Sequence, residues 1–167
     1  IYGRLPDRHE ILIEIASGQV IEYNGERWQN AFAEFVLENK FKTVVETGVS
    51  NAVSTDRILR AMEQYIGGTL YSTDPHPMHG TFNNYVDHPN WRKEKLFSLQ
   101  GLPLFFMEAG PFDAFVHDSN HEAECQNYEY EAAWGLTKPG GWICSDDWTW
   151  GGHDAWRNFC ARHQVHP

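Results

Sequence analysis

Cysteines are few in this sequence, and they fit neither a disulfide framework nor a zinc site. Cys125, Cys144 and Cys160 are odd in number, and no two of them have C-x-x-C spacing. Long apolar runs are also missing, since none approaches the roughly 20 residues that a membrane-spanning helix needs. No signal-peptide pattern follows Ile1, although a leader could precede it. We therefore expect reduced thiols in a cytoplasmic protein without a membrane partner.

Basic residues are in the minority, with 13 Lys and Arg against 23 Asp and Glu and a net charge of −10. Nucleic-acid-binding proteins usually carry a basic patch, and anionic membrane surfaces attract polybasic segments. The charge balance argues against both partners. It permits a site for a cation.

Phosphate-binding glycine motifs are absent as well. The sequence contains neither a full G-x-G-x-x-G nor a G-x-x-x-x-G-K-[ST]. A nicotinamide dinucleotide site and a nucleoside-triphosphate site are therefore poorly supported.

Strand-like and helix-like segments alternate from residue 41 onward. The expected strands are 41–48, 69–75, 93–101, 112–118 and 142–147, and the expected helices are 53–68, 122–141 and 153–163. Residues 102–110 leave room for little more than a helical turn. The alternation predicts an α/β fold with a Rossmann-like, mostly parallel sheet flanked by helices on both faces.

The first 40 residues form a lead-in segment to the domain at 41–167, and we expect a single domain overall. Residues 27–39 have the apolar spacing of an amphipathic helix. Residues 7–18 are ambiguous, because a D-x-x-E pattern and Gly18 favour a short helix while Ile11, Ile13 and Ile15 alternate as in a strand.

Acidic side chains follow the predicted strands where each strand ends. They are Glu46, Asp74, Asp118, Asp146 and Asp147. Ligands of open parallel sheets bind beyond the carboxyl ends of the strands. We therefore expect these carboxylates to surround one cleft, and the polar tail of "FDAFVHDSNH" (112–121) to emerge into it.

Three stretches together carry a family resemblance: "VVETGVSNAVST" (44–55), "LYSTDP" (70–75) and residues 112–148, with D-x-x-H, "LTKPGG" and an acid pair in order. They resemble class I S-adenosylmethionine-dependent methyltransferases, in the branch of macrocin-type O-methyltransferases and cephalosporin-hydroxylase-like proteins. The resemblance implies that Glu46 and Gly48 line the methionine end of the cofactor and that Asp74 holds its ribose. The other cofactor contacts that it implies are Ser50, Ser54, Thr55, Pro75, His76 and Asp118.

The same resemblance implies a metal site and a base. Asp118, Asp146 and Asp147 match carboxylates that ligate a divalent cation in this branch, and such hard oxygen ligands suit Mg²⁺. Asp118 and His121 would be catalytic, with His121 as general base for the acceptor hydroxyl. The alternative is that Asp118 and Asp147 bond loop amides or cap turns, and that His121 packs at a helix N-terminus.

The family's fold adds two strands after the fifth, and this sequence has none there. The sheet is expected either to lack them or to have its edge completed by the N-terminal segment or another subunit. An open edge favours a homo-oligomer.

The leading hypothesis is a metal-assisted O-methyltransferase for a small hydroxylated molecule, such as a sugar or a natural-product precursor. One alternative is a non-haem-iron hydroxylase that uses His117 or His121 with the acids. Another is a cofactor-binding subunit without turnover.

Overall fold

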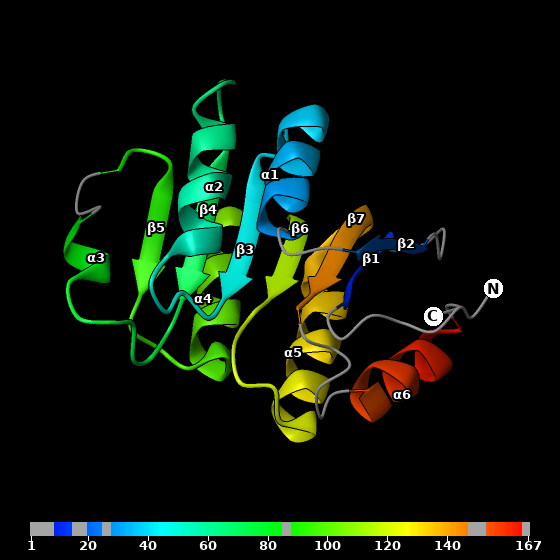
Figure 1. Cartoon of the computed structure of the whole chain (residues 1–167). Helices are drawn as coiled ribbons and strands as arrows, with labels where there is room; N and C mark the ends of the chain where they lie inside the picture. Colours follow the sequence, from blue (N-terminus) through cyan, green and yellow to red (C-terminus); the bar gives the residue numbers. More distant parts are fainter. Residues whose placement is uncertain (1–8, 15–19, 25–27, 85–87, 147–152, 165–167) are drawn as a thin grey trace.

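The computed structural model describes residues 9–14, 20–24, 28–84, 88–146 and 153–164, which build one sheet with helices on both faces (Figure 1). The sheet has seven strands in the order β2-β1-β7-β6-β3-β4-β5. The strands are β1 (His9–Glu14), β2 (Val20–Asn24), β3 (Thr43–Thr47), β4 (Thr69–Thr73), β5 (Trp91–Glu94), β6 (Phe112–His117) and β7 (Thr137–Ser145). The helices are α1 (Trp28–Asn39), α2 (Val53–Met62), α3 (Thr81–Asn84), α4 (Ser98–Ala109), α5 (Ala123–Leu136) and α6 (His153–His163).

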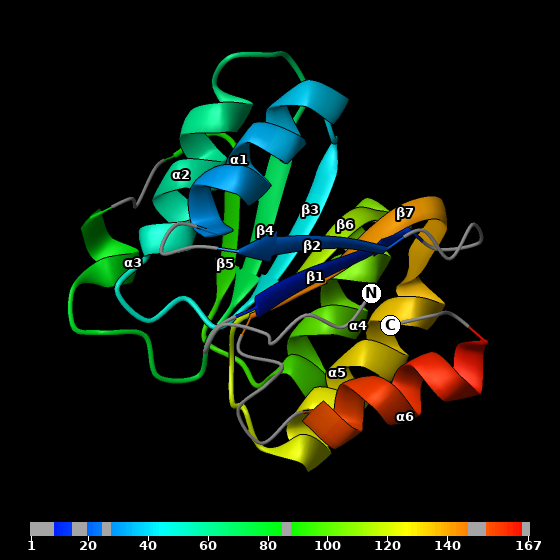
Figure 2. The ribbon, with the colours of Figure 1, turned by 45° about the vertical axis from the view of Figure 1, so that its right-hand side comes forward.

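The five strands from β7 to β5 run parallel, as the alternating pattern predicts. Helices α1 and α2 lie on one face of the sheet, and α4, α5 and α6 lie on the other (Figure 2). Both faces are therefore covered, which explains why every residue of β6 is buried. The predicted Rossmann-like α/β fold is confirmed.

Side-chain alternation along the strands divides the apolar interior into two cores. Val44 and Ala114 pack with α1 and α2, whereas their neighbours Val45 and Phe115 pack with α4, α5 and α6. Successive strand residues point to opposite faces of a sheet, so each strand serves both cores. Residues at even and at odd positions of a strand thus face different helices, and we call this property strand parity. It also decides toward which helices the side chains at the strand ends turn.

The N-terminal segment completes the sheet beside β7. β1 pairs antiparallel with β7, with Leu12 opposite Cys144, and β2 pairs antiparallel with β1. Of the two alternatives for residues 7–18, the strand is therefore correct and the helix wrong for residues 9–14, the part of this range that the structure describes. No strand follows β7 in the residues that the structure describes, so the edge is supplied by the N-terminal segment rather than by C-terminal strands.

Helix α4 corrects the expectation for residues 93–110. The strand expected at 93–101 ends at Glu94, and a helix of 12 residues, not a single turn, occupies Ser98–Ala109. Gly101 and Pro103 hide this helix, because both are poor helix formers. Tertiary packing overrides that weakness: a Cβ at position 101 would lie 2.6 Å from Thr73 Oγ1, so only glycine lets the helix approach β4 so closely.

The boundary between α5 and β7 is also earlier than expected. The helix ends at Leu136 rather than at Pro139, and "TKPGG" already belongs to β7.

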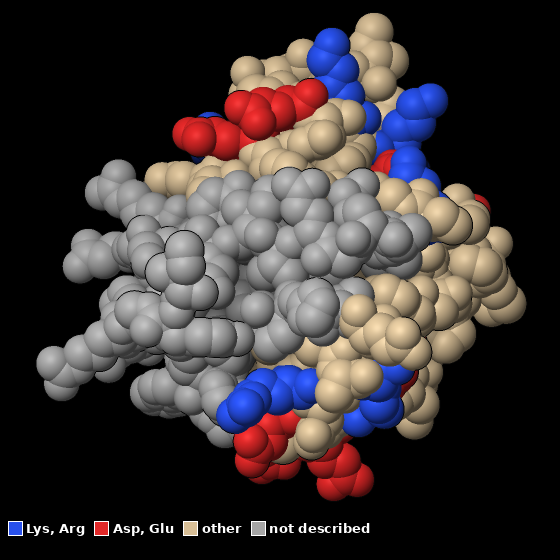
Figure 3. Space-filling view, turned by 90° about the vertical axis from the view of Figure 1, so that its right-hand side faces the viewer, with Lys and Arg blue, Asp and Glu red and all other residues tan. Residues whose placement is uncertain are grey.

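None of the described helices is both long and apolar enough to cross a membrane. On the face shown in Figure 3, the described acidic and basic side chains lie close to one another and form no broad positive surface.

Candidate functional site

The residues that follow four parallel strands are brought to one edge of the sheet by backbone hydrogen bonds. The Gly48 amide donates to the Thr73 carbonyl at 2.9 Å, the Asp118 amide to Thr47 at 2.9 Å, and the Asp146 amide to His117 at 2.9 Å. Each of these bonds continues the hydrogen-bond ladder between two neighbouring parallel strands by one residue beyond their ends. The loops after β3, β4 and β6 and the first residue after β7 therefore meet, as the acids at the strand ends predict.

A pocket of about 340 Å³ opens at this edge, and we call it the strand-end pocket. Its volume lies in the range of small-molecule sites. Six of the residues predicted to contact a cofactor line it: Gly48, Ser50, Asp74, Pro75, His76 and Asp118. Phe97 and Ser98 at the start of α4 also line it, which sequence reasoning did not identify because α4 itself was not expected.

Gly48 allows the loop after β3 to pass against the loop after β6. Its φ of +84° lies in the left-handed region, and a Cβ there would be only 2.0 Å from the carbonyl oxygen of Asp118. Any side chain at position 48 would therefore be strained twice, by the left-handed backbone conformation and by the clash with Asp118. The glycine of the "ETG" motif is therefore required by the close contact between two pocket walls.

Asp74 supports the same loop from the end of β4. Its Oδ2 accepts hydrogen bonds from the Val49 and Ser50 amides, each at 2.9 Å, and its Oδ1 accepts from the His76 amide at 2.7 Å. The carboxylate lies in the pocket wall and shapes the loop around it. Its contact with a ribose stays a prediction.

Glu46 does not line the strand-end pocket, and its place at the methionine end of the cofactor stays a prediction. Its fully buried carboxylate accepts hydrogen bonds from Ser54 Oγ (2.6 Å), Thr55 Oγ1 (2.7 Å) and Ser72 Oγ (2.9 Å). Burial raises the pKa of Glu46, and the three hydroxyls partly oppose this.

Ser54 and Thr55 are likewise outside the strand-end pocket, because their hydroxyls point to Glu46. The reason is strand parity: Glu46 has the parity of Val44, which faces α1 and α2. These three residues fix the start of α2 under the loop, outside the strand-end pocket, and Ser54 also lines a second, adjoining cavity.

A second cavity of about 270 Å³ adjoins the strand-end pocket. Asp118 and Ser50 line both cavities, and Asp146, Gln29 and Asn51 line the second one. Two of the three predicted metal ligands, Asp118 and Asp146, are therefore brought to one space.

Asp147, the third predicted metal ligand, lies outside the described residues. Within the described part of the chain, no group of three or more His, Cys, Asp or Glu side chains has the arrangement of a metal site. His121 lines neither cavity in the described structure; its ring lies perpendicular to that of His117, with centroids 5.7 Å apart. The metal site and the role of His121 as base stay predictions.

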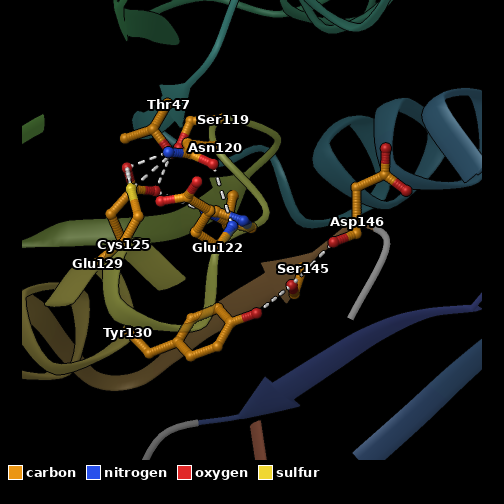
Figure 4. A network of polar contacts seen from close by, with 10 residues as sticks. Thr47, Ser119, Asn120, Glu122, Cys125, Glu129, Tyr130, Ser145 and Asp146 are labelled. Atoms are coloured by element: carbon orange, nitrogen blue, oxygen red, sulfur yellow. Dashed lines mark hydrogen bonds and ion pairs between the residues drawn. The ribbon is translucent and has the colours of Figure 1, made fainter. Parts of the chain in front are cut away.

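Glu129 is the site residue that sequence reasoning missed. In the sequence, "EYE" (129–131) and the other acids of this helix are most simply a solvated face. The structure contradicts this for Glu129, which is fully buried and lines the strand-end pocket. Thr47 and Ser119 lie beside its carboxylate (Figure 4), and the ring of His117 also bonds to it. The available signal was helical spacing: Gln126, Glu129, Tyr130 and Ala133 are the buried stripe of α5.

The Glu129 carboxylate is ionised in spite of its burial. Burial alone would raise its pKa, but the hydrogen bond and charge of His117, together with the hydroxyls of Thr47 and Ser119, lower the pKa to about 2. Cys125 also contacts it, with Sγ 3.6 Å from Oε1, and burial followed by the charge of Glu129 raises the pKa of this thiol to about 11. The ionised carboxylate therefore accepts hydrogen bonds from all four of these groups.

Comparisons with known proteins agree with this geometry. A family model described as "Methyltransferase domain" matches residues 45–148, while no curated protein matches the chain. An O-methyltransferase from Bacillus cereus, solved with S-adenosylhomocysteine (SAH), has a TM-score of 0.68 at 15% identity, over 87% of this chain and 72% of that chain. TomG from Streptomyces achromogenes, an O-methyltransferase involved in tomaymycin synthesis and solved with S-adenosylmethionine, has 0.67 at 15%, over 87% and 71%.

A third structure adds a metal. MycE from the mycinamycin biosynthetic pathway, solved with Mg, SAH and mycinamycin VI, has a TM-score of 0.52 at 18% identity, over 71% of this chain and 34% of that chain. At these identities the three structures show a shared fold. The family match covers more than half of the sequence and includes the loops of the strand-end pocket. The chain therefore belongs to the methyltransferase domain family, with the fold of class I S-adenosylmethionine-dependent methyltransferases.

Proposed function

We propose that the protein transfers the methyl group of S-adenosylmethionine to a hydroxyl of a small molecule, with assistance from a divalent cation. One observation carries the proposal: two adjoining cavities share Asp118 and Ser50 in their walls. The strand-end pocket accommodates the cofactor, and the second cavity accommodates the acceptor. The methyl group then passes between them beside Asp118.

The residues of the second cavity suit this chemistry in part. Asp118 and Asp146 offer hard carboxylate oxygens, which Mg²⁺ prefers, and Asp147 follows directly in the sequence. A bound divalent cation would lower the pKa of an acceptor hydroxyl near it. Gln29 accepts a hydrogen bond from Arg57 on its amide oxygen at 3.2 Å, so its amide nitrogen remains as a donor for an acceptor oxygen.

The transfer itself is a single displacement. The acceptor oxygen attacks the methyl carbon, the carbon–sulfur bond breaks, and its electron pair stays on sulfur to give SAH. The hydroxyl proton leaves to a general base, the role that the sequence resemblance gives to His121; because His121 lines neither cavity, the proton would reach it through a water molecule. Holding both reactants in line supplies much of the rate, so the rigid loops around Asp118 matter as much as the base.

The roles of the similar proteins support an acceptor from natural-product biosynthesis. TomG is involved in tomaymycin synthesis, and MycE, from the mycinamycin biosynthetic pathway, was solved with Mg, SAH and mycinamycin VI. The structure of TDP-rhamnose 3′-O-methyltransferase, with a TM-score of 0.63, points to sugars as another class. We propose natural-product precursors and sugars as the substrate classes of the present chain. We also propose that the chain forms a homo-oligomer.

Calorimetric titration with S-adenosylmethionine, followed by methyl-transfer assays with and without Mg²⁺, tests the proposal. The expected result is cofactor binding, and SAH release that depends on a hydroxylated acceptor and falls when EDTA is added. Cofactor binding without transfer to any of a broad acceptor panel would instead favour a subunit without turnover. Fe²⁺-dependent oxygen consumption without methyl transfer would favour a hydroxylase.

A further inference from the structure

Glu129 bonds to residues beside the two loops, after β3 and after β6, that meet in the wall of the strand-end pocket. We propose that it is a positioning residue for the cofactor: one carboxylate holds the loops after β3 and β6 at a set separation and so determines how tightly the nucleoside binds. The proposal rests on the assignment of this pocket to S-adenosylmethionine and deepens it.

Each oxygen of the carboxylate holds a different loop. Thr47 Oγ1 donates to Oε2 at 2.5 Å, and Ser119 Oγ donates to Oε1 at 2.7 Å. Thr47 directly precedes Gly48, and Ser119 directly follows Asp118. The two bonds therefore act on the residues next to the close contact between Gly48 and the Asp118 carbonyl.

The carboxylate is itself fixed from behind. His117, fully buried at the end of β6, donates through Nδ1 to Oε2 at 2.6 Å, and Cys125 Sγ lies 3.6 Å from Oε1. The adjacent Tyr130 anchors α5 in the apolar core and bonds Ser145 at 2.6 Å. A side chain held this way on a packed helix is a rigid support for the two loops.

Two acceptor oxygens are needed for this task. An amide at position 129 keeps the shape but offers one acceptor oxygen and no charge, so on the other side the hydroxyl must reverse and accept from the NH₂ group. The link to that side is then a neutral hydrogen bond, which is weaker than one to a carboxylate. An aspartate keeps both acceptors but is one methylene shorter, so it reaches the two loops poorly.

The test compares dissociation constants of S-adenosylmethionine and SAH, measured by calorimetry on the full chain. We expect Glu129→Gln to weaken both ligands at least tenfold and by the same factor within about twofold, because loop separation affects both alike. Glu131→Gln, two residues along on the surface of α5, removes the same charge and should leave both constants unchanged. Tyr130→Phe removes a buried hydrogen bond from the same helix and should lower the melting temperature without changing either constant.

Three outcomes would overturn the proposal. Unchanged affinities in Glu129→Gln would show that the loops need no such link. A loss confined to the sulfonium ligand would indicate direct charge attraction instead of positioning. An equal loss of affinity in Tyr130→Phe would reduce the effect to general destabilisation.

A double-mutant cycle keeps the proposal testable by a second route. Thr47→Val breaks the same link from the loop side, so Thr47→Val combined with Glu129→Gln should lose clearly less affinity than the two single losses multiplied. Fully multiplicative losses would contradict a shared link.

If Glu129→Gln does not fold, Ser119→Ala takes its place: a similar loss of affinity for both ligands supports the proposal, and no loss overturns it. No methyl acceptor is used, so a chain that binds both ligands but methylates nothing would refute the proposed function alone.

Discussion

Replacing Gly48 by alanine adds one methyl group where two walls of the pocket touch. The new Cβ would lie 2.0 Å from the carbonyl oxygen of Asp118, 2.5 Å from its carbonyl carbon and 2.7 Å from the Cα of Ser119. All three neighbours are backbone atoms, so no side chain can turn away. The loop after β6 must move, or the loop after β3 must.

The size of the movement follows from these distances. Cβ contacts under 3.0 Å are essentially never seen, so the two loops must separate by at least about 1 Å, the difference between 3.0 and 2.0 Å. A displacement of that size near the reacting groups can lower a rate about 100-fold. The positive φ of +84° adds about 1–2 kcal/mol of backbone strain for any residue with a Cβ.

We therefore expect Gly48→Ala to weaken cofactor binding at least tenfold and to lower kcat/KM for methyl transfer about 100-fold. Gly67→Ala is the matched control, because Gly67 has a similar φ of +93° but nothing within 4 Å of its added Cβ. It should carry only the backbone strain, which lowers the melting temperature of a chain of this size by a few degrees. Calorimetry and thermal unfolding of both variants separate the two contributions.

The two variants behaving alike would refute this reasoning. If Gly48→Ala binds the cofactor as tightly as the wild-type chain, the contact with Asp118 does not set the pocket's shape. If Gly67→Ala also loses cofactor affinity, the loss arises from backbone strain in general.

Asp74→Ala removes the acceptor of three loop amides, so it should weaken cofactor binding at least tenfold in calorimetry; binding at wild-type strength would contradict this. Asp146→Asn should leave cofactor affinity unchanged but lower Mg²⁺-dependent methyl transfer at least tenfold, and transfer at the wild-type rate would argue against Asp146 as a metal ligand. The pKa of Glu129, about 2 when folded against 4.5 ordinarily, means that the unfolded chain binds more protons between these values. Its contribution to the free energy of unfolding is therefore complete above pH 4.5 and is lost as the pH falls toward 2. Denaturant titrations between pH 4.5 and pH 2 should show that the free energy of unfolding falls less steeply with pH in Glu129→Gln than in the wild-type chain. Equal slopes in the two proteins would contradict the lowered pKa of Glu129.

Local patterns in the sequence were sufficient for the parallel part of the fold. The β-branched runs, the helical spacing and the glycine-rich turns predicted four of the five parallel strands near their observed places, and they put Asp74, Asp118 and Gly48 at one edge. Such features are local, because strand and helix periodicity depend on neighbouring residues. The start of α4 was missed because Gly101 and Pro103 weaken its local signal, while its contact with Thr73 is made in space.

Strand-end acids were predicted as a group, yet their side chains separate in the structure. Parity along β3 turns Glu46 toward α2, whereas Asp74 and Asp118 come one residue after their strands and enter the pocket wall. Counting from Val44 along the strand would have placed Glu46 correctly. The position of a residue at a strand end therefore carries less information than the face it occupies.

By itself the sequence determined the alternating elements, the family and the edge of the sheet at which the strand-end pocket opens, because these depend on local spacing and on motifs within short loops. Only the tertiary structure decided that β1 completes the sheet beside β7 and that Glu129 links Thr47, 82 residues away, with Ser119. Such contacts join residues far apart in the chain, and which ones meet depends on how the helices pack on the two faces of the sheet. A buried carboxylate on an otherwise polar helix is recognised only when its donors, supplied by other segments, are seen around it.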